Sequence, residues 1–224
     1  MRMLTLGFWL LCATGCSGPV FELTPPTRPL VYTAIGASDA VGVGADDPTR
    51  DGWVSVLYRK LPGDSRLVNL GISGTLLRSA LAQQLPVALD ATPDLVTVWL
   101  AVNDFNARVP LEEYSASLDT LLDRLATETH ARVLVANVPD LTLVPVYDAV
   151  PRDLLRSEVT RWNAAIASSV ARHQAILVDL HPLTTELLDR PTLVGLDGFH
   201  PSAEGHRRLA EVMWDAIQAN QVLP

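Results

Sequence analysis

The sequence predicts an α/β domain, with helices on both faces of one five-stranded parallel sheet. From residue 30 onward, short apolar, β-branched segments alternate with segments of helical periodicity. Such alternation favours parallel strands joined by crossover helices. The central segment, residues 95–102, is apolar throughout, which is typical of a strand covered on both faces. No repeat or further change of composition divides this part, so we expect one domain, residues 30–224.

Each expected element follows from a local pattern. Four of the five apolar segments stop at glycine or proline, or close to one, and these residues interrupt regular structure. Leucine and other apolar residues recur at helical spacing in three segments between or after the strands. The expected strands are residues 30–35, 67–70, 95–102, 133–138 and 175–180, and the expected helices include residues 118–125, 155–170 and 209–217.

Composition excludes several classes of function. The chain has 224 residues, of which 48% are hydrophobic and 19% charged, as in ordinary globular proteins rather than disordered ones. Its net charge of −8 offers no basic footprint for nucleic acid, so we expect no such partner. The two cysteines, Cys12 and Cys16, cannot form a disulfide framework or a thiolate zinc site, and no histidine pair has metal-ligand spacing. We expect no metal.

The N-terminal segment has the pattern of an export signal. A basic start, a short apolar run and small residues precede Cys16. The step Ala-Thr-Gly-Cys resembles the lipobox of bacterial lipoproteins, although alanine stands where leucine is usual. We therefore expect a signal peptide over residues 1–15, a lipidated Cys16 and a proline-rich tether over residues 16–29. The protein would be a membrane-anchored lipoprotein of the bacterial envelope; the alternative is a soluble periplasmic or extracellular protein.

The first strand ends in Gly-Ala-Ser-Asp-Ala, which puts Ser38 two residues after Gly36. The segment lacks the spacing and lysine of a phosphate-binding loop, and its glycines are too far apart for a dinucleotide loop. Two roles remain for Ser38: a turn residue, or a nucleophile displayed on a tight turn. Ser73, after the second strand, is a rival nucleophile without the same position relative to a strand.

Asp197 and His200 lie three residues apart before the last helix, across a turn that contains glycine. A carboxylate at this spacing can accept the Nδ1–H of the imidazole, which leaves Nε2 free to take a proton from a serine. His206, on the following helix, is expected to be a partly exposed side chain. The residue types therefore point to nucleophilic catalysis by a Ser-His-Asp triad.

The four motifs together resemble the SGNH (GDSL-type) hydrolases, including their lipoprotein-type esterases and lipases. Gly-Ala-Ser38, Gly71, Asn103 and Asp197-x-x-His200 match the four family blocks in order, over residues 36–202. Alanine replaces the usual Asp before Ser38, and another alanine replaces the usual Gly two residues before Asn103. The resemblance implies a flavodoxin-like three-layer α/β/α fold and ester hydrolysis without a cofactor.

Site roles follow from the resemblance by matching position. Ser38 would be the nucleophile, His200 the general base and acid, and Asp197 the residue that orients His200. The oxyanion hole would consist of the N–H groups of Ser38 and Gly71 and the side chain of Asn103. The expected function is a serine esterase that forms an acyl-enzyme from short-acyl esters, lysophospholipids or acetylated sugars. The alternative is a non-catalytic flavodoxin-like binding lipoprotein of the envelope.

An unusually apolar loop, residues 139–151, follows the fourth strand. One interpretation is that it lines or caps an acyl pocket beside Ser38; the other is that it packs on the surface of its own domain. The candidate pocket residues are Leu141, Leu143, Val144 and Tyr147.

Overall fold

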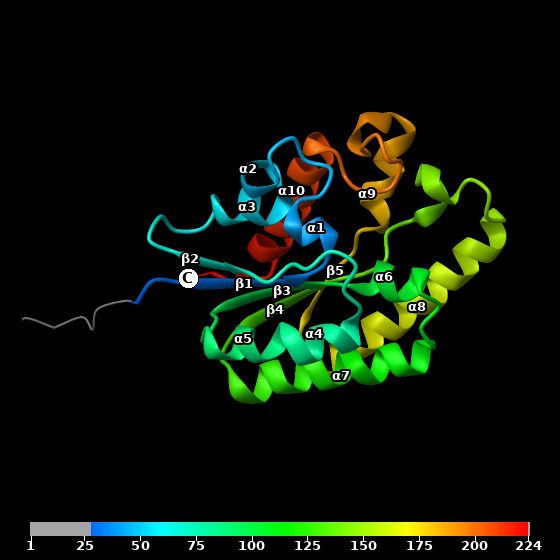
Figure 1. The fold of residues 1–224 in the computed structure, drawn as a ribbon. Coiled ribbons are helices and arrows are strands. Elements are labelled where there is room, and N and C mark those ends of the chain that lie inside the picture. Colours follow the sequence, from blue (N-terminus) through cyan, green and yellow to red (C-terminus); the bar gives the residue numbers. More distant parts are fainter. Residues whose placement is uncertain (1–27, 224) are drawn as a thin grey trace, which may run out of the picture.

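A computed structural model describes residues 28–223 of the chain. Five parallel strands form one sheet in the order β2-β1-β3-β4-β5 (Figure 1). The predicted α/β class and the five parallel strands are confirmed. The strands are β1 (Val31–Gly36), β2 (Arg66–Asn69), β3 (Leu95–Trp99), β4 (Arg132–Ala136) and β5 (Ile176–Val178).

Ten α-helices and four 3₁₀ turns connect and cover these strands within the described residues. The α-helices are α1 (Ser38–Val41), α2 (Pro48–Asp51), α3 (Trp53–Tyr58), α4 (Leu77–Gln83), α5 (Leu85–Asp90), α6 (Ala101–Asn106), α7 (Leu111–Glu128), α8 (Arg152–Arg172), α9 (His181–Thr185) and α10 (Ala203–Ala219). The 3₁₀ turns are η1 (Leu141–Leu143), η2 (Pro145–Tyr147), η3 (Glu186–Leu188) and η4 (Pro191–Leu193). None of the helices described is both long and apolar enough to cross a membrane.

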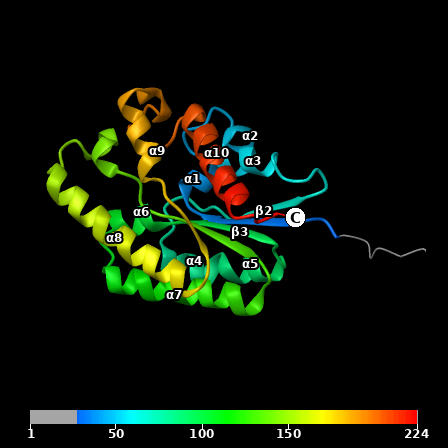
Figure 2. The same ribbon diagram turned by 180° about the vertical axis from the view of Figure 1, so that it is seen from behind.

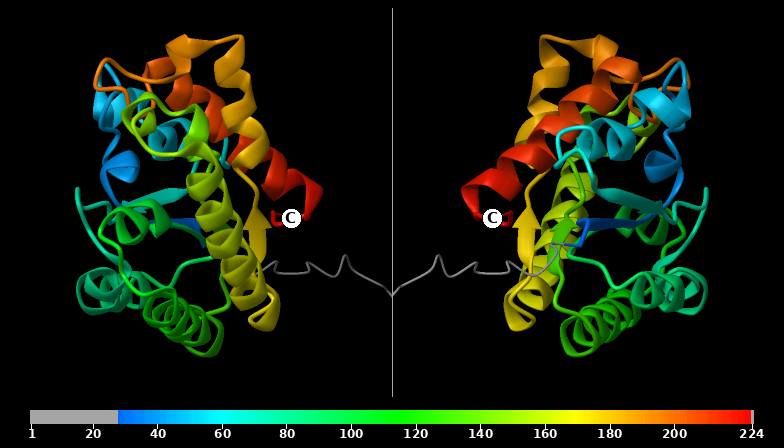
Figure 3. Two further views of the ribbon diagram at one scale, coloured as in Figure 1. Left: turned by 90° about the vertical axis from the view of Figure 1, so that its right-hand side faces the viewer. Right: turned by 90° about the vertical axis from the view of Figure 1, so that its left-hand side faces the viewer.

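The sheet has a hydrophobic core on each face because side chains alternate along its strands. In β3, Leu95 and Trp99 belong to the cluster under α3 and α10, whereas Val96 and Val98 belong to the cluster under α4, α5, α7 and α8. Figure 2 shows these two helical layers from behind, and Figure 3 shows them viewed along the strands. The carboxyl ends of all five strands therefore meet at one edge of the sheet, where ligands bind in open α/β folds.

Strand ends differ from the prediction by one or two residues at several places, and the largest difference is at the end of β3. Strand β3 ends at Trp99, and helix α6 begins at Ala101, so residues 100–102 do not continue the strand. Leu100 and Ala101 are buried, so an apolar run could not distinguish the end of a buried strand from the start of a buried helix. The early helix places Asn103 directly over the end of the sheet. The signal peptide, Cys16 and nearly all of the tether lie outside the described residues.

Candidate active site

Ser38 is the first residue of α1 and follows the turn that ends β1. A side chain at Gly36 would place a Cβ 2.6 Å from that of Ala40, so glycine permits this close turn. The side chain of Gln84 donates to the Gly36 carbonyl and accepts from its N–H, both at 3.0 Å. Gln84 is 1% exposed. This buried amide fixes the strand end from which Ser38 projects.

Asp197 and His200 lie on a tight loop between η4 and α10. The Asp197 carboxylate accepts the backbone N–H groups of Phe199 at 2.9 Å and His200 at 3.0 Å. Gly198 has φ of +70°, a conformation that favours glycine. A bridge between Val194 and Pro201 closes the loop. The three-residue spacing therefore folds the carboxylate back against the imidazole.

The structure brings the three residues into one hydrogen-bonded chain. Nδ1 of His200 lies 2.6 Å from Oδ2 of Asp197, and its Nε2 lies 2.9 Å from Oγ of Ser38. A carboxylate accepts but cannot donate, so Nδ1 carries the proton and Nε2 of the neutral ring is the acceptor for the serine hydroxyl. The geometry therefore allows proton transfer from Ser38 to His200.

Electrostatics keep the carboxylate in its charged form. Partial burial by itself would raise the pKa of Asp197. The hydrogen bonds from the His200 ring and from the backbone N–H groups of Phe199 and His200 outweigh that effect and lower the pKa below its usual value. Asp197 is thus an anion against which positive charge on the His200 ring is stabilised.

A second glycine brings the serine segment and the histidine loop together. Gly44 has φ of +96°, and a Cβ there would clash with the Pro201 carbonyl and lie 3.2 Å from Cβ of His200. The backbone after α1 therefore passes directly against the loop that carries His200. Close approach at Gly44 helps residues far apart in the sequence to meet.

Asn103 lies on the same cavity wall as Ser38 and His200. Its Nδ2 donates to the Thr75 carbonyl at 3.0 Å, which holds the amide in place. An amide NH₂ has two hydrogens, so one remains for another acceptor. The backbone N–H of Ser38 has no hydrogen-bond partner within residues 28–223. These two donors are available to an oxygen atom bound beside Ser38.

Gly71 lies against α1, where a Cβ would approach the N atom of Val41 to 2.8 Å. Its N–H, however, donates to Oδ1 of Asn69 at 3.0 Å. Nδ2 of Asn69 in turn donates to the Ala40 carbonyl at 2.7 Å, so this side chain connects β2 to α1. The N–H of Gly71 is therefore already bonded in this structure, and its role as an oxyanion donor stays a prediction.

The loop after β4 contributes two of the four expected pocket residues. Leu141 and Val144 line the cavity beside Ser38, whereas Leu143 and Tyr147 do not. A 3₁₀ turn repeats every three residues, so η1 presents positions 141 and 144 on one side. The hydroxyl of Tyr147 instead donates to Oδ1 of Asn106 at 2.7 Å. Leu143 and Tyr147 therefore do not line this cavity, and their part in substrate binding stays a prediction.

The prediction of a partly exposed His206 was wrong, since its side chain is completely buried. Nδ1 accepts the backbone N–H of Trp53 at 3.2 Å, and Nε2 donates to the Val43 carbonyl at 3.0 Å. Burial lowers the pKa of His206, which favours the neutral ring that these two bonds require. Helical position alone could not reveal that α3 and the segment after α1 cover this side chain.

Sequence reasoning missed Gln84 and Asn69 as residues that position the site. Both are polar side chains bonded to backbone groups at the turn that carries Ser38. For Asn69, the one feature in the sequence that could have indicated this role is its place at the end of a strand, shortly before Gly71. No such feature marks Gln84, because its partner Gly36 is 48 residues away in the chain.

Known proteins match this chain in sequence and in fold. Residues 34–208 match the sequence pattern of the GDSL-like Lipase/Acylhydrolase family. The chain belongs to this family. It is an ester hydrolase of the SGNH/GDSL type, and the matched region contains all four motifs.

Relatives of this GDSL-like hydrolase include two esterases. An acetylxylan esterase of Geobacillus stearothermophilus is 25% identical over 172 residues, covering 71% of this chain and 74% of that protein. An arylesterase of Vibrio mimicus is 28% identical over 178 residues, covering 77% and 82%. The crystal structure of TesA is similar in fold, with a TM-score of 0.68 and 24% identity over 86% of this chain and 99% of that one.

Proposed function

We propose that this protein hydrolyses carboxylic esters through an acyl-enzyme formed on Ser38, with His200 as general base and acid. The observation that carries the proposal is the continuous chain from Oγ of Ser38 through the His200 ring to Asp197, with contacts of 2.9 and 2.6 Å. Asp197 orients the ring and stabilises its charged form. The esterase names of the two relatives support the reaction class.

Ser38, His200 and one water molecule carry out both halves of the reaction. Oγ of Ser38 forms a bond to the ester carbonyl carbon while its proton passes to Nε2 of His200. The carbonyl oxygen becomes an anion, which the Ser38 N–H and the free amide hydrogen of Asn103 stabilise. The carbon–oxygen bond to the alcohol breaks, and His200 returns its proton to the leaving oxygen. Water then releases the acid by the same steps, which restores Ser38 and the neutral ring.

A serine-reactive fluorophosphonate probe tests the nucleophile. We expect the full-length protein to be labelled and the Ser38→Ala variant to be neither labelled nor able to cleave p-nitrophenyl acetate. Ser73→Ala is the matched control, because Ser73 is an exposed serine after the next strand. This control is expected to keep both labelling and turnover.

Two outcomes would contradict the assignment. Loss of labelling in Ser73→Ala but not in Ser38→Ala would transfer the nucleophile to the rival serine. Absence of labelling and of turnover in the folded wild-type protein would favour the non-catalytic envelope binding lipoprotein instead. Circular dichroism of each variant separates loss of chemistry from loss of fold.

We further propose that Cys16 carries a lipid anchor that attaches the domain to a membrane of the bacterial envelope. The support is the sequence pattern before Cys16 and the proline-rich segment that follows it. Two or more acyl chains hold a protein stably on a bilayer, whereas one chain does not. We expect the wild-type protein in the membrane fraction and Cys16→Ser outside it. Equal membrane retention of both would contradict the anchor, and Cys12→Ser is the matched control.

A further inference from the structure

The cavity beside Ser38 extends well past the reacting groups. Its volume is about 120 Å³, and Ser38, Asn103 and His200 lie on its wall together with a larger set of aliphatic side chains. An acetyl group would place a single methyl beyond the carbonyl carbon. The cavity therefore has room for more than the smallest acyl group.

Part of the cavity wall comes from a segment that the sequence did not single out. Leu183 on α9 and Leu187 on η3 line the cavity, as do Leu141 and Val144 of the loop after β4. Leu183 packs against the core cluster under α10, and Leu187 packs against the cluster on the other face. The cavity thus lies where the two hydrophobic cores approach each other at the carboxyl edge of the sheet.

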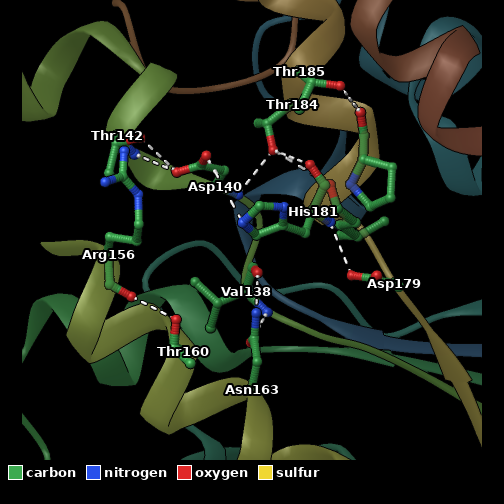
Figure 4. Close-up of polar contacts among 12 residues, drawn as sticks. Val138, Asp140, Thr142, Arg156, Thr160, Asn163, Asp179, His181, Thr184 and Thr185 are labelled. Atoms are coloured by element: carbon green, nitrogen blue, oxygen red, sulfur yellow. Dashed lines mark hydrogen bonds and ion pairs between the residues drawn. The ribbon is translucent and has the colours of Figure 1, made fainter. Parts of the chain in front are cut away.

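A hydrogen bond joins these two wall segments (Figure 4). The backbone N–H of Asp140 donates to Oγ1 of Thr184 at 2.8 Å. The Asp140 carboxylate caps η1 through the N–H and hydroxyl of Thr142, and His181 lies 3.8 Å from its other oxygen. The aliphatic walls are therefore held in position before a substrate binds. An acyl chain can enter without the entropic cost of ordering them.

We propose that this cavity is the acyl site and that the protein prefers carboxylic esters with a straight acyl chain of about four to six carbons, since an apolar cavity of ~150 Å³ holds benzene. The inference rests on the proposed function, because it assumes acyl transfer to Ser38. Each buried methylene adds about 0.8 kcal/mol, or roughly fourfold in rate if the gain is realised in the transition state.

A chain-length series on the full-length protein tests the acyl site. The substrates are p-nitrophenyl acetate, butanoate, hexanoate, octanoate and dodecanoate, compared by kcat/KM. We expect a maximum at butanoate or hexanoate, roughly 15–250-fold above acetate, from the burial of two to four further methylenes. A steady fall from acetate onward would overturn the proposal while leaving the proposed esterase function in place. No turnover of any ester, with no fluorophosphonate labelling, would instead overturn the function.

A second series distinguishes the acyl group from the alcohol as the occupant. Methyl, butyl and hexyl acetates keep the acyl group constant and lengthen the alcohol. We expect kcat/KM in this series to change by less than about threefold, which is below the gain of one buried methylene. A strong rise with alcohol length and none with acyl length would assign the cavity to the alcohol and overturn the proposal.

Variants of the wall should move the preference in opposite directions. Leu183→Trp shortens the cavity and should lower the hexanoate-to-acetate ratio by about tenfold or more, whereas Leu187→Ala enlarges it and should move the maximum toward octanoate. Leu188→Trp is the matched control, since Leu188 lies on the same turn with 71% exposure and should leave the profile unchanged. An unchanged profile in folded Leu187→Ala would contradict the assignment even if Leu183→Trp fails to fold.

Discussion

At the active site, hydrogen bonds hold single side chains in place and still leave one polar group of each side chain for the reaction. Asn103 uses one amide hydrogen on the Thr75 carbonyl and retains the other. His200 gives Nδ1 to Asp197 and keeps Nε2 for Ser38. Each reactive atom is therefore positioned before any substrate binds, which is the condition under which electrostatic stabilisation of a transition state costs no reorganisation.

Replacing Asn103 by alanine should lower kcat for p-nitrophenyl acetate by a factor of about 10²–10³, with little change in KM. This is the usual effect of removing one oxyanion donor. The amide stabilises charge that develops only in the transition state, which is why kcat falls. Asn106→Ala is the matched control, because Asn106 lies on the same helix, is exposed and bonds only Tyr147. A change confined to KM would argue against the donor role.

Elements meet at the site through short polar contacts between loops. The loop after β4 is joined to α9 by Asp140 and Thr184, and to α8 by Asn163, which pairs with both backbone groups of Val138 (Figure 4). Asn137 connects the ends of β4 and β5 through Asp179 and the N–H of Leu180. The walls of the cavity are thus fixed to the same strand ends that carry the chemistry.

The variant Thr184→Val tests the connection between the loop after β4 and α9. Valine has the shape of threonine but leaves the buried N–H of Asp140 without its acceptor, which should lower the free energy of unfolding by about 1–3 kcal/mol. Thr184→Ser keeps the hydroxyl and should lose less. Urea unfolding followed by circular dichroism measures both. Equal stability of wild type and Thr184→Val would show that the bond does not hold the loop.

Across the whole molecule, two acids with raised pKa values make stability depend on pH. Burial raises the pKa of Asp39, which accepts from the Trp53 indole, to about 7, and that of Asp104, which caps the N-terminus of α4, to about 6. They belong to opposite helical layers of the fold. The folded protein keeps protons on these two acids that the unfolded chain releases near pH 4. The acids therefore stabilise the fold most at low pH. Their contribution to the free energy of unfolding is lost as pH rises through 6 and 7.

Asp39→Asn should remove one of these contributions. Asparagine has no charge and retains an oxygen acceptor for the indole of Trp53. The variant should therefore gain stability relative to wild type as pH increases from 5 to 8, by about 1–3 kcal/mol. Denaturant unfolding at the two values measures the difference. A difference in stability between variant and wild type that does not change with pH would contradict the raised pKa of Asp39.

Much of this architecture follows from local patterns in the chain. Alternating strand and helix periodicity predicted the parallel sheet, and the three-residue spacing across Gly198 predicted the contact between Asp197 and His200. Both depend on neighbours in sequence, for which spacing is a sufficient guide. The end of β3 was misplaced because residues 100–102 are apolar in either conformation, and the burial of His206 was missed because α3 covers it from a distant part of the chain.

The sequence by itself therefore determined the fold class, the chemical types at the strand ends and the order in which they occur. Only the tertiary structure decided that the Gly71 N–H is bonded to Asn69, and that Leu183 and Leu187 face the cavity whereas Leu143 and Tyr147 do not. The physical reason is distance along the chain. The contact between Asp140 and Thr184 joins residues 44 positions apart, and no local pattern records which distant side chain will complete a hydrogen bond or close a cavity.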